Sequence, residues 1–247
     1  MTTPARRRRD RSHPAAHPHV RLVLASASPA RHALLVAAGI VPQVVVSDVD
    51  EDAALAAAAE EATAAGRTLP VSEQVAVLAR AKAEAVAATL STETAPRLVL
   101  GCDSLLELDG VAHGKPGTPE RARAAWASMR GRSGVLHSGH HLIATGAFGV
   151  AGANDDGAND GVPGTTRTRT AVSSTTVHFA DISDEEIAAY VATGEPLQVA
   201  GAFTIDGVGG AFVAGVDGDH HGVLGLSLPL LRTVLADLGI PYPALWT

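Results

Sequence analysis

Two serines and an arginine follow directly on an apolar run near the start of this 247-residue sequence. Residues 22–25 are apolar, Ser26 and Ser28 come next, and Arg31 lies one helical turn further on. Ser28 suits a helix N-cap, and Pro29 suits the first helical position. Backbone N–H groups and hydroxyls at such a strand-to-helix turn form an anion site, to which Arg31 adds a positive charge. An ordinary connection between a strand and a helix gives the same pattern, so both interpretations remain open for this segment alone.

Carboxylates stand out at two further places. Four acids fall within residues 48–52, Glu51 among them, and they repel one another unless solvent or a cation screens them. We therefore expect this segment to be either a wet loop or a metal-binding one. Asp103 follows the apolar run 98–100, so we expect it at the carboxyl end of a strand, where open α/β sheets bind their ligands.

The sequence has only two lysines, Lys82 and Lys115. Lys82 falls on the apolar stripe of the helix predicted over 72–89, and a lysine on a buried face needs an anionic partner. The alternative is that its ammonium group reaches the edge of the helix and stays in water. Lys115 lies in a Gly-Lys-Pro turn.

Together with Ser104 and Arg132, these residues combine cations with carboxylates near the ends of apolar elements. Such a set suits a polyphosphate, because Lys and Arg hold phosphate oxygens while carboxylates hold a divalent metal ion that bridges them. The sequence contains neither a P-loop nor a dinucleotide-binding fingerprint.

The elements that must position these residues alternate between strands and helices, which predicts an α/β protein with one central sheet, partly antiparallel. We expect strands over 22–25, 43–47, 98–100, 134–145 and 170–179, and a glycine-rich β segment over 200–216. We expect helices over 29–38, 72–89, 118–130, 184–193 and 228–238.

Composition narrows the class of protein. The single cysteine, Cys102, excludes an intrachain disulfide and predicts a reducing cytoplasm. No apolar run is long enough to span a membrane. The net charge is −7, yet residues 1–20 alone carry +4 and read as a disordered basic tail, so the body is too acidic to bind nucleic acid stably. Residues 149–166 read as a low-complexity surface loop inserted in a single domain over 21–247.

The sequence resembles, motif by motif and in order, the Maf (septum formation protein) family of nucleotide pyrophosphatases over about residues 21–240. The segments that carry the resemblance are LASASPARHALLVAAGI, VDED, ARAKAEAVA, LGCDSLLELDGVAHGKPGTPERA, MRGRSGVLHSG, GEP, AGAFTIDGVGGAFV and GDHHGVLGLSLPLL. The resemblance implies an elongated α/β fold with a cleft between two lobes, and commonly a homodimer. It also implies that unwanted nucleoside triphosphates are hydrolysed to the monophosphate and pyrophosphate with a divalent cation, Mg²⁺ or Mn²⁺.

The resemblance also assigns roles residue by residue. Asp103 matches the proton acceptor and Glu51 the acidic position associated with the metal. Lys82 and Lys115 match the two family lysines, which would stabilise the leaving pyrophosphate. The phosphate-binding signature corresponds to Ser26, Ser28 and Arg31.

Several positions depart from the family pattern. Ala30 stands where a second arginine is usual, and Gly134 and Val199 replace a histidine and a lysine. The positions that discriminate the base fall at Ala30, Ser104 and Asp206, which lack the pattern associated with dTTP and UTP. The preferred nucleotide therefore stays open.

Other interpretations are weaker. A histidine metal site is one of them, with His137, His140 and His141 on one predicted strand and His220 and His221 in a later turn. His137 and His141 share one face of that strand while His140 points away, so the strand does not supply three ligands. Cys102 lacks a neighbouring histidine and is expected to pack as a small apolar residue. The alternative function is a non-catalytic, nucleotide-binding regulator of cell division, in which the missing cations have left binding without hydrolysis.

Overall fold

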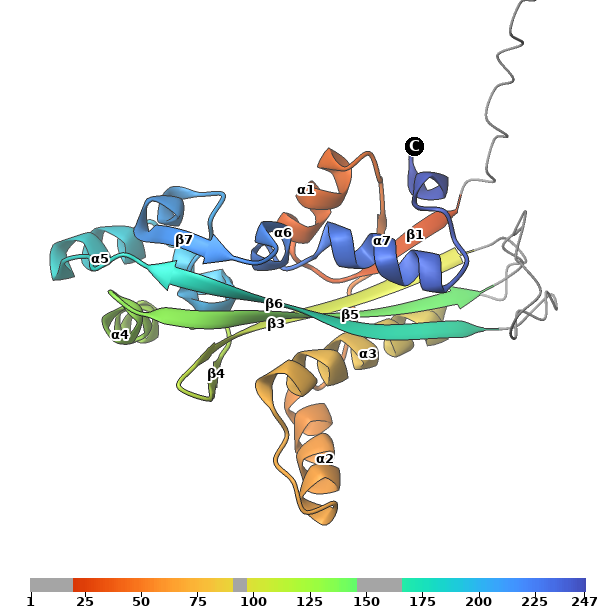
Figure 1. Cartoon of the computed structure of the whole chain (residues 1–247), viewed down its shortest axis with the longest axis horizontal. Helices are drawn as coiled ribbons and strands as arrows, with labels where there is room; N and C mark the ends of the chain where they lie inside the picture. The colour runs from red at the N-terminus through yellow and green to blue at the C-terminus, as the bar shows by residue number, and fades with distance from the viewer. Residues whose placement is uncertain (1–19, 91–96, 146–165) are drawn as a thin grey trace, which may run out of the picture.

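One mixed seven-stranded sheet organises the chain in the computed structural model, which describes residues 20–90, 97–145 and 166–247 (Figure 1). Its strands are β1 (Arg21–Ala25), β2 (Gln43–Val44), β3 (Arg97–Leu108), β4 (Val111–His113), β5 (Ser133–Thr145), β6 (Arg167–Phe179) and β7 (Val213–Asp217). The strand order is β2-β1-β3-β5-β6-β7, and β4 pairs with β3 outside that path. The predicted α/β class with a partly antiparallel sheet is confirmed.

On one of its two sides, β3 pairs with a different strand in each half of its length. In its first half β3 pairs in parallel with β1, and that ladder ends at Ala25 and Gly101. In its second half the same strand pairs antiparallel with β4, and that ladder begins at Leu106 and His113. Residues 102–105 lie in the gap between the two ladders, while β5 pairs continuously along the opposite edge. Asp103 therefore lies inside a long strand, just past the end of β1, and the prediction that its own strand ends there is wrong.

The helices cover the two faces of the sheet unequally (Figure 1). They are α1 (Pro29–Ala37), α2 (Glu51–Ala64), α3 (Val71–Thr89), α4 (Pro119–Met129), α5 (Asp184–Ala192), α6 (His220–Val223) and α7 (Leu228–Asp237). Helices α1, α6 and α7 lie over one face and α3 lies along the other, from which α2 projects, while α4 and α5 lie at one end. The five predicted helices are all present.

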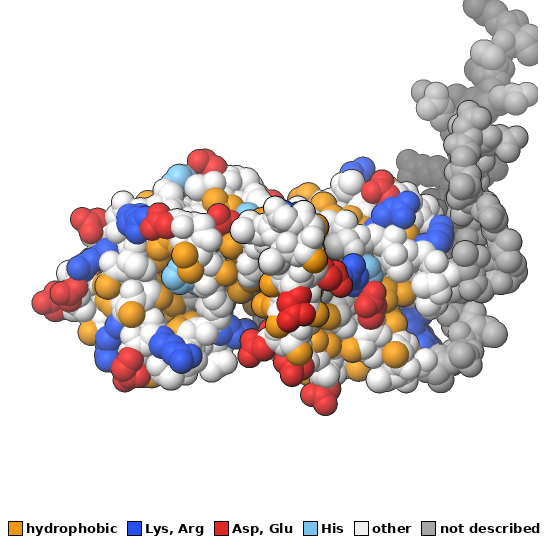
Figure 2. Space-filling model, turned by 90° about the horizontal axis from the view of Figure 1, so that it is seen from below, with side chains coloured by type: hydrophobic (Ala, Val, Ile, Leu, Met, Phe, Trp, Pro, Cys, Tyr) orange, Lys and Arg blue, Asp and Glu red, His pale blue; other side chains and the backbone are white. Residues whose placement is uncertain are grey.

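Residues 48–52 do not form a loop throughout. Asp50 caps α2 by accepting a hydrogen bond from the backbone N–H of Ala53 at 2.9 Å, and Glu51 is the first helical residue. An acidic first turn suits the positive end of the helix dipole, and the alanine run that follows has the highest helix propensity. Seen from below, Asp and Glu side chains gather over the column formed by α2 (Figure 2). The screening of these charges therefore comes partly from the helix itself.

Two glycines allow α3 to lie directly on the sheet. A Cβ atom added at Gly101 of β3 would lie 2.0 Å from the carbonyl oxygen of Ala79, and one at Gly139 of β5 would lie 2.2 Å from that of Val75. Only a residue without a side chain fits at such a close approach of two backbones. These two contacts fix the height of α3 over the centre of the sheet.

Apolar side chains pack on both faces of the sheet. The cluster beneath α1 and α7 includes Leu35, Leu100 and Leu231, all buried. A second cluster surrounds Trp126 of α4, whose ring meets Phe179, Tyr190 and Phe212 edge to face. Edge-to-face pairs add to the stability that area burial supplies. The two halves of the long sheet thus have separate packing centres.

The glycine-rich segment 200–216 is not the predicted β segment. It consists of two short 3₁₀ helices, Ala200–Ala202 and Val208–Phe212, with only the end of the segment entering β7. A third 3₁₀ helix, Glu195–Gln198, precedes it, and a fourth, Tyr242–Leu245, ends the chain. Similarly, the predicted strand over 43–47 is reduced to β2.

Two predicted segments fall almost entirely on residues that the structure does not describe. The predicted tail 1–20, apart from Val20, and the predicted loop insertion 149–166, apart from Thr166, lie outside the described residues. Within the part of the chain that the structure describes, no helix is long and apolar enough to cross a membrane.

Candidate functional site

The ammonium group of Lys82 joins two carboxylates that are far apart in the sequence. Its Nζ atom lies 2.6 Å from Oδ1 of Asp103 and 2.8 Å from Oε1 of Glu51. The side chains of Lys82 and Asp103 are 11% and 12% exposed, so this pair is largely removed from water, whereas that of Glu51 is 51% exposed. The anionic partner that the position of Lys82 on α3 required is therefore present.

This triad has one N–H group to spare. An ammonium group has three donors, and Asp103 and Glu51 accept two of them. Among the described residues the third N–H meets no acceptor, so it is available to a ligand. A phosphate oxygen is an acceptor that suits it, because a charged donor and a charged acceptor make the stronger kind of hydrogen bond.

Arg31 connects the serine turn to the gap in the β3 ladder. Its guanidinium group is buried and donates to the carbonyl oxygen of Cys102 at 2.9 Å, which the change of partner along β3 leaves free. The same nitrogen, Nη1, also donates to the hydroxyl of Ser26 at 2.9 Å, and Nη2 donates to the hydroxyl of Ser104 at 3.0 Å. Nε donates to the carbonyl oxygen of Gly225 at 2.8 Å. Four of its five N–H bonds thus go to the protein, so Arg31 holds this region together.

The serine turn has the local structure that the sequence predicts. Ser28 is the N-cap of α1, with its hydroxyl accepting from the backbone N–H of Arg31 at 3.4 Å, and Pro29 is the first helical residue. The hydroxyl of Ser26 accepts from the backbone N–H of Ser28 at 3.2 Å. Ser26 is buried and Ala30 is half-buried beside this turn. The turn therefore lies against the same edge of β3 as Asp103.

A short chain of hydroxyl groups continues from Arg31 across the sheet. The hydroxyls of Ser104 and Ser138 lie 2.8 Å apart, and Ser138 donates to the carbonyl oxygen of Gly222 at 2.7 Å. Ser138 is completely buried on β5. The segment around α6 is consequently fixed to the same centre by Gly222 as well as by Gly225. No local pattern of residues indicates the bonds to Gly222 and Gly225, because their acceptors are backbone carbonyl groups.

Glu195 organises the loop that carries Asp206. Its carboxylate accepts hydrogen bonds from the hydroxyl of Tyr190 and from the backbone N–H groups of Val208 and Gly209, each at 2.9 Å. Burial raises the pKa of Glu195, but these three hydrogen bonds outweigh it and leave the pKa below its ordinary value. Asp206 itself is exposed and accepts from the hydroxyl of Thr204. Glu195 belongs to the Gly-Glu-Pro motif, to which the sequence alone assigned no role.

Lys115 and Arg132 take no part in the ion pairs that join Lys82 to Asp103 and Glu51. Lys115 is exposed on the loop between β4 and α4, and that loop is held by hydrogen bonds from Gly201 to Gly114 and from Gly117 to Leu197. Arg132 makes a two-pronged ion pair with Asp109 at 2.6 and 2.7 Å. The catalytic role of Lys115, in stabilising the leaving pyrophosphate, and the role of Arg132 in substrate binding stay predictions.

Cys102 does not have the surroundings of a nucleophile. The side chain is buried in the apolar cluster beneath α1 and α7, and burial raises the pKa of its thiol to about 11. The residue thus stays a neutral thiol near pH 7 and packs as a small apolar side chain, as predicted.

Asp103 and Glu51 fit a divalent metal ion of the Mg²⁺ class. Their carboxylate groups converge on one ammonium nitrogen, so both are within reach of a single cation. Mg²⁺ is commonly bound by one or two carboxylates, with substrate phosphates and water completing its coordination. Two oxygen donors of this kind beside the serine turn are compatible with that pattern.

Comparisons with known proteins show which family this sequence matches. The family model described as Maf-like protein matches residues 21–238. Three relatives are each called nucleoside triphosphate pyrophosphatase. That of Salinispora tropica is 51% identical over 229 residues, covering 92% of this chain and 88% of the relative. That of Nocardia farcinica is 51% identical over 226 residues, covering 91% and 96%. That of Streptomyces coelicolor is 48% identical over 230 residues, covering 93% and 96%.

The match runs through every element that positions the site, from β1 and the serine turn to the end of α7. It thus includes Arg31, Glu51, Lys82 and Asp103, which the fold brings together. This chain belongs to the Maf family.

Proposed function

We propose that this protein hydrolyses nucleoside triphosphates between the α and β phosphates, releasing the monophosphate and pyrophosphate and so removing unwanted nucleotides. The observation that carries the proposal is the Lys82 ammonium group held between Asp103 and Glu51 next to the serine turn. The relatives' shared name, nucleoside triphosphate pyrophosphatase, supports the same reaction.

In the proposed mechanism, Asp103 acts as the general base. Its carboxylate accepts a proton from a water molecule as the water oxygen attacks the α phosphorus. The bond between that phosphorus and the oxygen bridging to the β phosphate breaks, and the electron pair leaves with pyrophosphate. Burial against Lys82 holds the Asp103 carboxylate in one orientation.

The cations of the site would bind the charge that builds up on pyrophosphate. Lys82 would use its remaining N–H on a phosphate oxygen, and Lys115 would approach from the β4 loop. Donors already in place cost no reorganisation during the reaction, and removing one commonly slows an enzyme by about 100- to 1,000-fold. Ser26 and Ser28 would hold the phosphates at the turn that Arg31 fixes.

A divalent ion, Mg²⁺ or Mn²⁺, would be held by Asp103 and Glu51. When bound, it would supply positive charge to the phosphate oxygens and help to generate the attacking nucleophile.

The Asp103→Asn variant tests the proposal. Asparagine keeps the shape and one oxygen acceptor but cannot take the proton, so we expect turnover to fall by about 100- to 10,000-fold. Products from a panel of nucleoside triphosphates with Mg²⁺ or Mn²⁺ are identified by chromatography, and melting of both proteins checks the fold. Asp237→Asn, at an exposed acid of α7, is the matched control and should leave turnover unchanged.

Water labelled with heavy oxygen identifies the phosphorus that is attacked. The label is expected in the monophosphate. Label in pyrophosphate, or release of orthophosphate and a diphosphate, would overturn the proposed reaction, and full turnover by Asp103→Asn would remove Asp103 from it. The alternative, a non-catalytic regulator, predicts that nucleotides raise the melting temperature of the wild-type protein while no monophosphate forms.

A further inference from the structure

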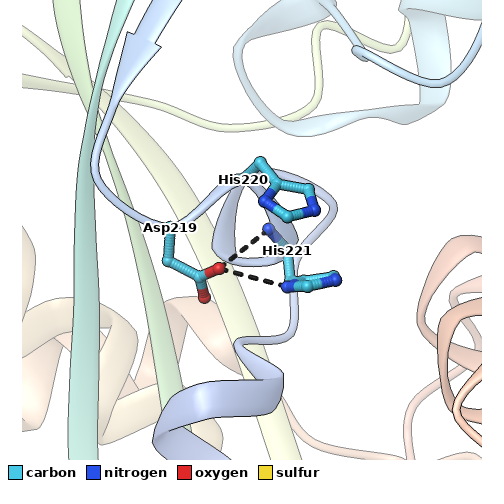
Figure 3. A group of neighbouring side chains, drawn as sticks. All are labelled: Asp219, His220 and His221. Atoms are coloured by element: carbon cyan, nitrogen blue, oxygen red, sulfur yellow. Dashed lines mark hydrogen bonds and ion pairs between the residues drawn. The ribbon is translucent and has the colours of Figure 1, made fainter.

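Three consecutive residues before and within α6 form a cluster that the proposed reaction does not use. Asp219, His220 and His221 each offer one metal-ligating atom, and these three atoms lie within 4.8 Å of one another (Figure 3). Among the described residues no other group of three or more His, Cys, Asp or Glu side chains meets this criterion. The cluster lies on the face of the sheet that carries α1 and α7, opposite α3 (Figure 1).

Asp219 is held in place before any ligand arrives. Its two carboxylate oxygens accept hydrogen bonds from the backbone N–H groups of His221 at 3.1 Å and Gly222 at 3.2 Å. Its own backbone N–H and carbonyl groups bond to the hydroxyl of Thr175 on β6, at 3.1 and 3.0 Å. The carboxylate is therefore already oriented by the backbone of α6 and by β6.

The distances suit a small tetrahedral ion. Oδ1 of Asp219 and Nδ1 of His221 lie 3.2 Å apart. Two ligands at about 2.0–2.1 Å from a tetrahedral Zn²⁺ are separated by about 3.3 Å. The His220 ring packs against that of His221, with 3.8 Å between ring centroids. His220 is exposed, so its side chain is free to turn its nitrogen toward the other two ligands.

We propose that Asp219, His220 and His221 bind a transition-metal ion of the Zn²⁺ or Ni²⁺ class, with three protein ligands and a fourth position open to solvent. Imidazole nitrogen favours these ions over Mg²⁺, which prefers oxygen ligands. The site is thus chemically distinct from the carboxylate pair of Glu51 and Asp103. The inference does not depend on the reaction proposed above.

Metal binding here would also restrain the backbone that contacts the candidate active site. The cluster leads directly into Gly222, whose carbonyl oxygen accepts from Ser138, and into Gly225, whose carbonyl oxygen accepts from Arg31. An ion bound to Asp219 and both histidines would fix the backbone at the start of this segment. We therefore expect it to raise the melting temperature of the whole protein.

Calorimetric titration of the metal-free, untagged protein with ZnCl₂ in excess Mg²⁺ tests the site. We expect His220→Ala and His221→Ala to lose one equivalent of bound Zn²⁺ relative to wild type, or to bind it more than about tenfold more weakly. Asp219→Asn should show the same loss while keeping an acceptor for the α6 N–H groups. His178→Gln is the matched control, because His178 and Asp217 form an exposed pair at 3.0 Å outside the cluster.

The outcome is decided by the difference between variants. Equal Zn²⁺ stoichiometry and affinity in wild type, the three ligand variants and His178→Gln would overturn the proposal, as would the absence of Zn²⁺ binding by wild type. Co²⁺ gives a second readout, because tetrahedral coordination produces an intense visible absorption band. That band should appear with wild type and His178→Gln and disappear with His220→Ala and His221→Ala.

Discussion

Glu195→Gln is the most informative single substitution outside the Lys82 triad. The carboxylate receives three hydrogen bonds, from the Tyr190 hydroxyl and from the N–H groups of Val208 and Gly209. Oε1 accepts two of them and Oε2 accepts the third, from Val208. Glutamine keeps one oxygen and turns an NH₂ group toward the remaining N–H donor. One hydrogen bond is therefore replaced by two donors that face each other. The other two hydrogen bonds become weaker, because their acceptor no longer carries a negative charge.

The size of the effect follows from those bonds. A hydrogen bond to a charged group contributes about 1.5–3 kcal/mol and a neutral one about 0.5–1.5 kcal/mol. Losing one bond and weakening two gives about 3–4 kcal/mol, which partial exposure of Glu195 to water reduces to about 2 kcal/mol. If the loop that carries Asp206 must be ordered to bind nucleotide, the KM rises by up to about 30-fold. We expect kcat to change little, because Lys82 and Asp103 are untouched.

Urea unfolding and steady-state kinetics with pyrophosphate detection measure the two effects. Glu60→Gln, at an exposed carboxylate of α2, is the control and should change neither quantity. Refutation would be a Glu195→Gln protein whose unfolding midpoint and KM both equal those of the control. A fall in kcat with an unchanged KM would also contradict the reasoning, because it would place Glu195 in the chemical step.

Two further predictions concern stability. Burial, with the nearby Arg31 charge, lowers the pKa of His140 to about 4, and its Nε2 accepts from the backbone N–H of Ser227 at 2.9 Å. The unfolded chain takes up this proton first as pH falls below about 6.5, so up to about 3 kcal/mol of stability is lost by pH 4. Urea unfolding of the wild-type protein between pH 6.5 and pH 4 should show this loss of stability, and the His140→Gln variant should lose less stability over the same range. Equal pH dependence of stability in the two proteins would contradict the role of His140. Gly139→Ala should lower the free energy of unfolding by about 3 kcal/mol or more, because the added Cβ would lie 2.2 Å from the Val75 carbonyl oxygen. Gly215→Ala is the control, because a Cβ there makes only ordinary contacts. Equal urea midpoints for the two variants would disprove the close approach at Gly139.

Local structure at the serine turn was predictable because it depends on neighbouring residues. The Ser28 side chain caps α1 by bonding to the N–H three residues on, and within a helix a proline such as Pro29 fits only the first turn. The requirement that Lys82 meet an anion was equally local, because it followed from helical spacing and the cost of burying a charge. Residues 48–52 show the limit of such reasoning. Their charges suggested a wet loop or a metal-binding segment; the structure shows instead that Asp50 begins a helix and Glu51 pairs with Lys82, while metal binding by Glu51 stays a prediction.

By itself the sequence determined the α/β class and five of the helices, namely α1, α3, α4, α5 and α7, whereas α2 was not predicted. It also determined the list of charged residues from which a polyphosphate site could be built. Only the tertiary structure decided which of these residues meet. The change of partner along β3 leaves the carbonyl of Cys102 for Arg31, and Gly101 and Gly139 bring α3 close enough for Lys82 to reach Asp103. Such contacts join backbone groups and elements far apart in the chain, and their partners are chosen by packing distance and strand register, which no local pattern of residue types records.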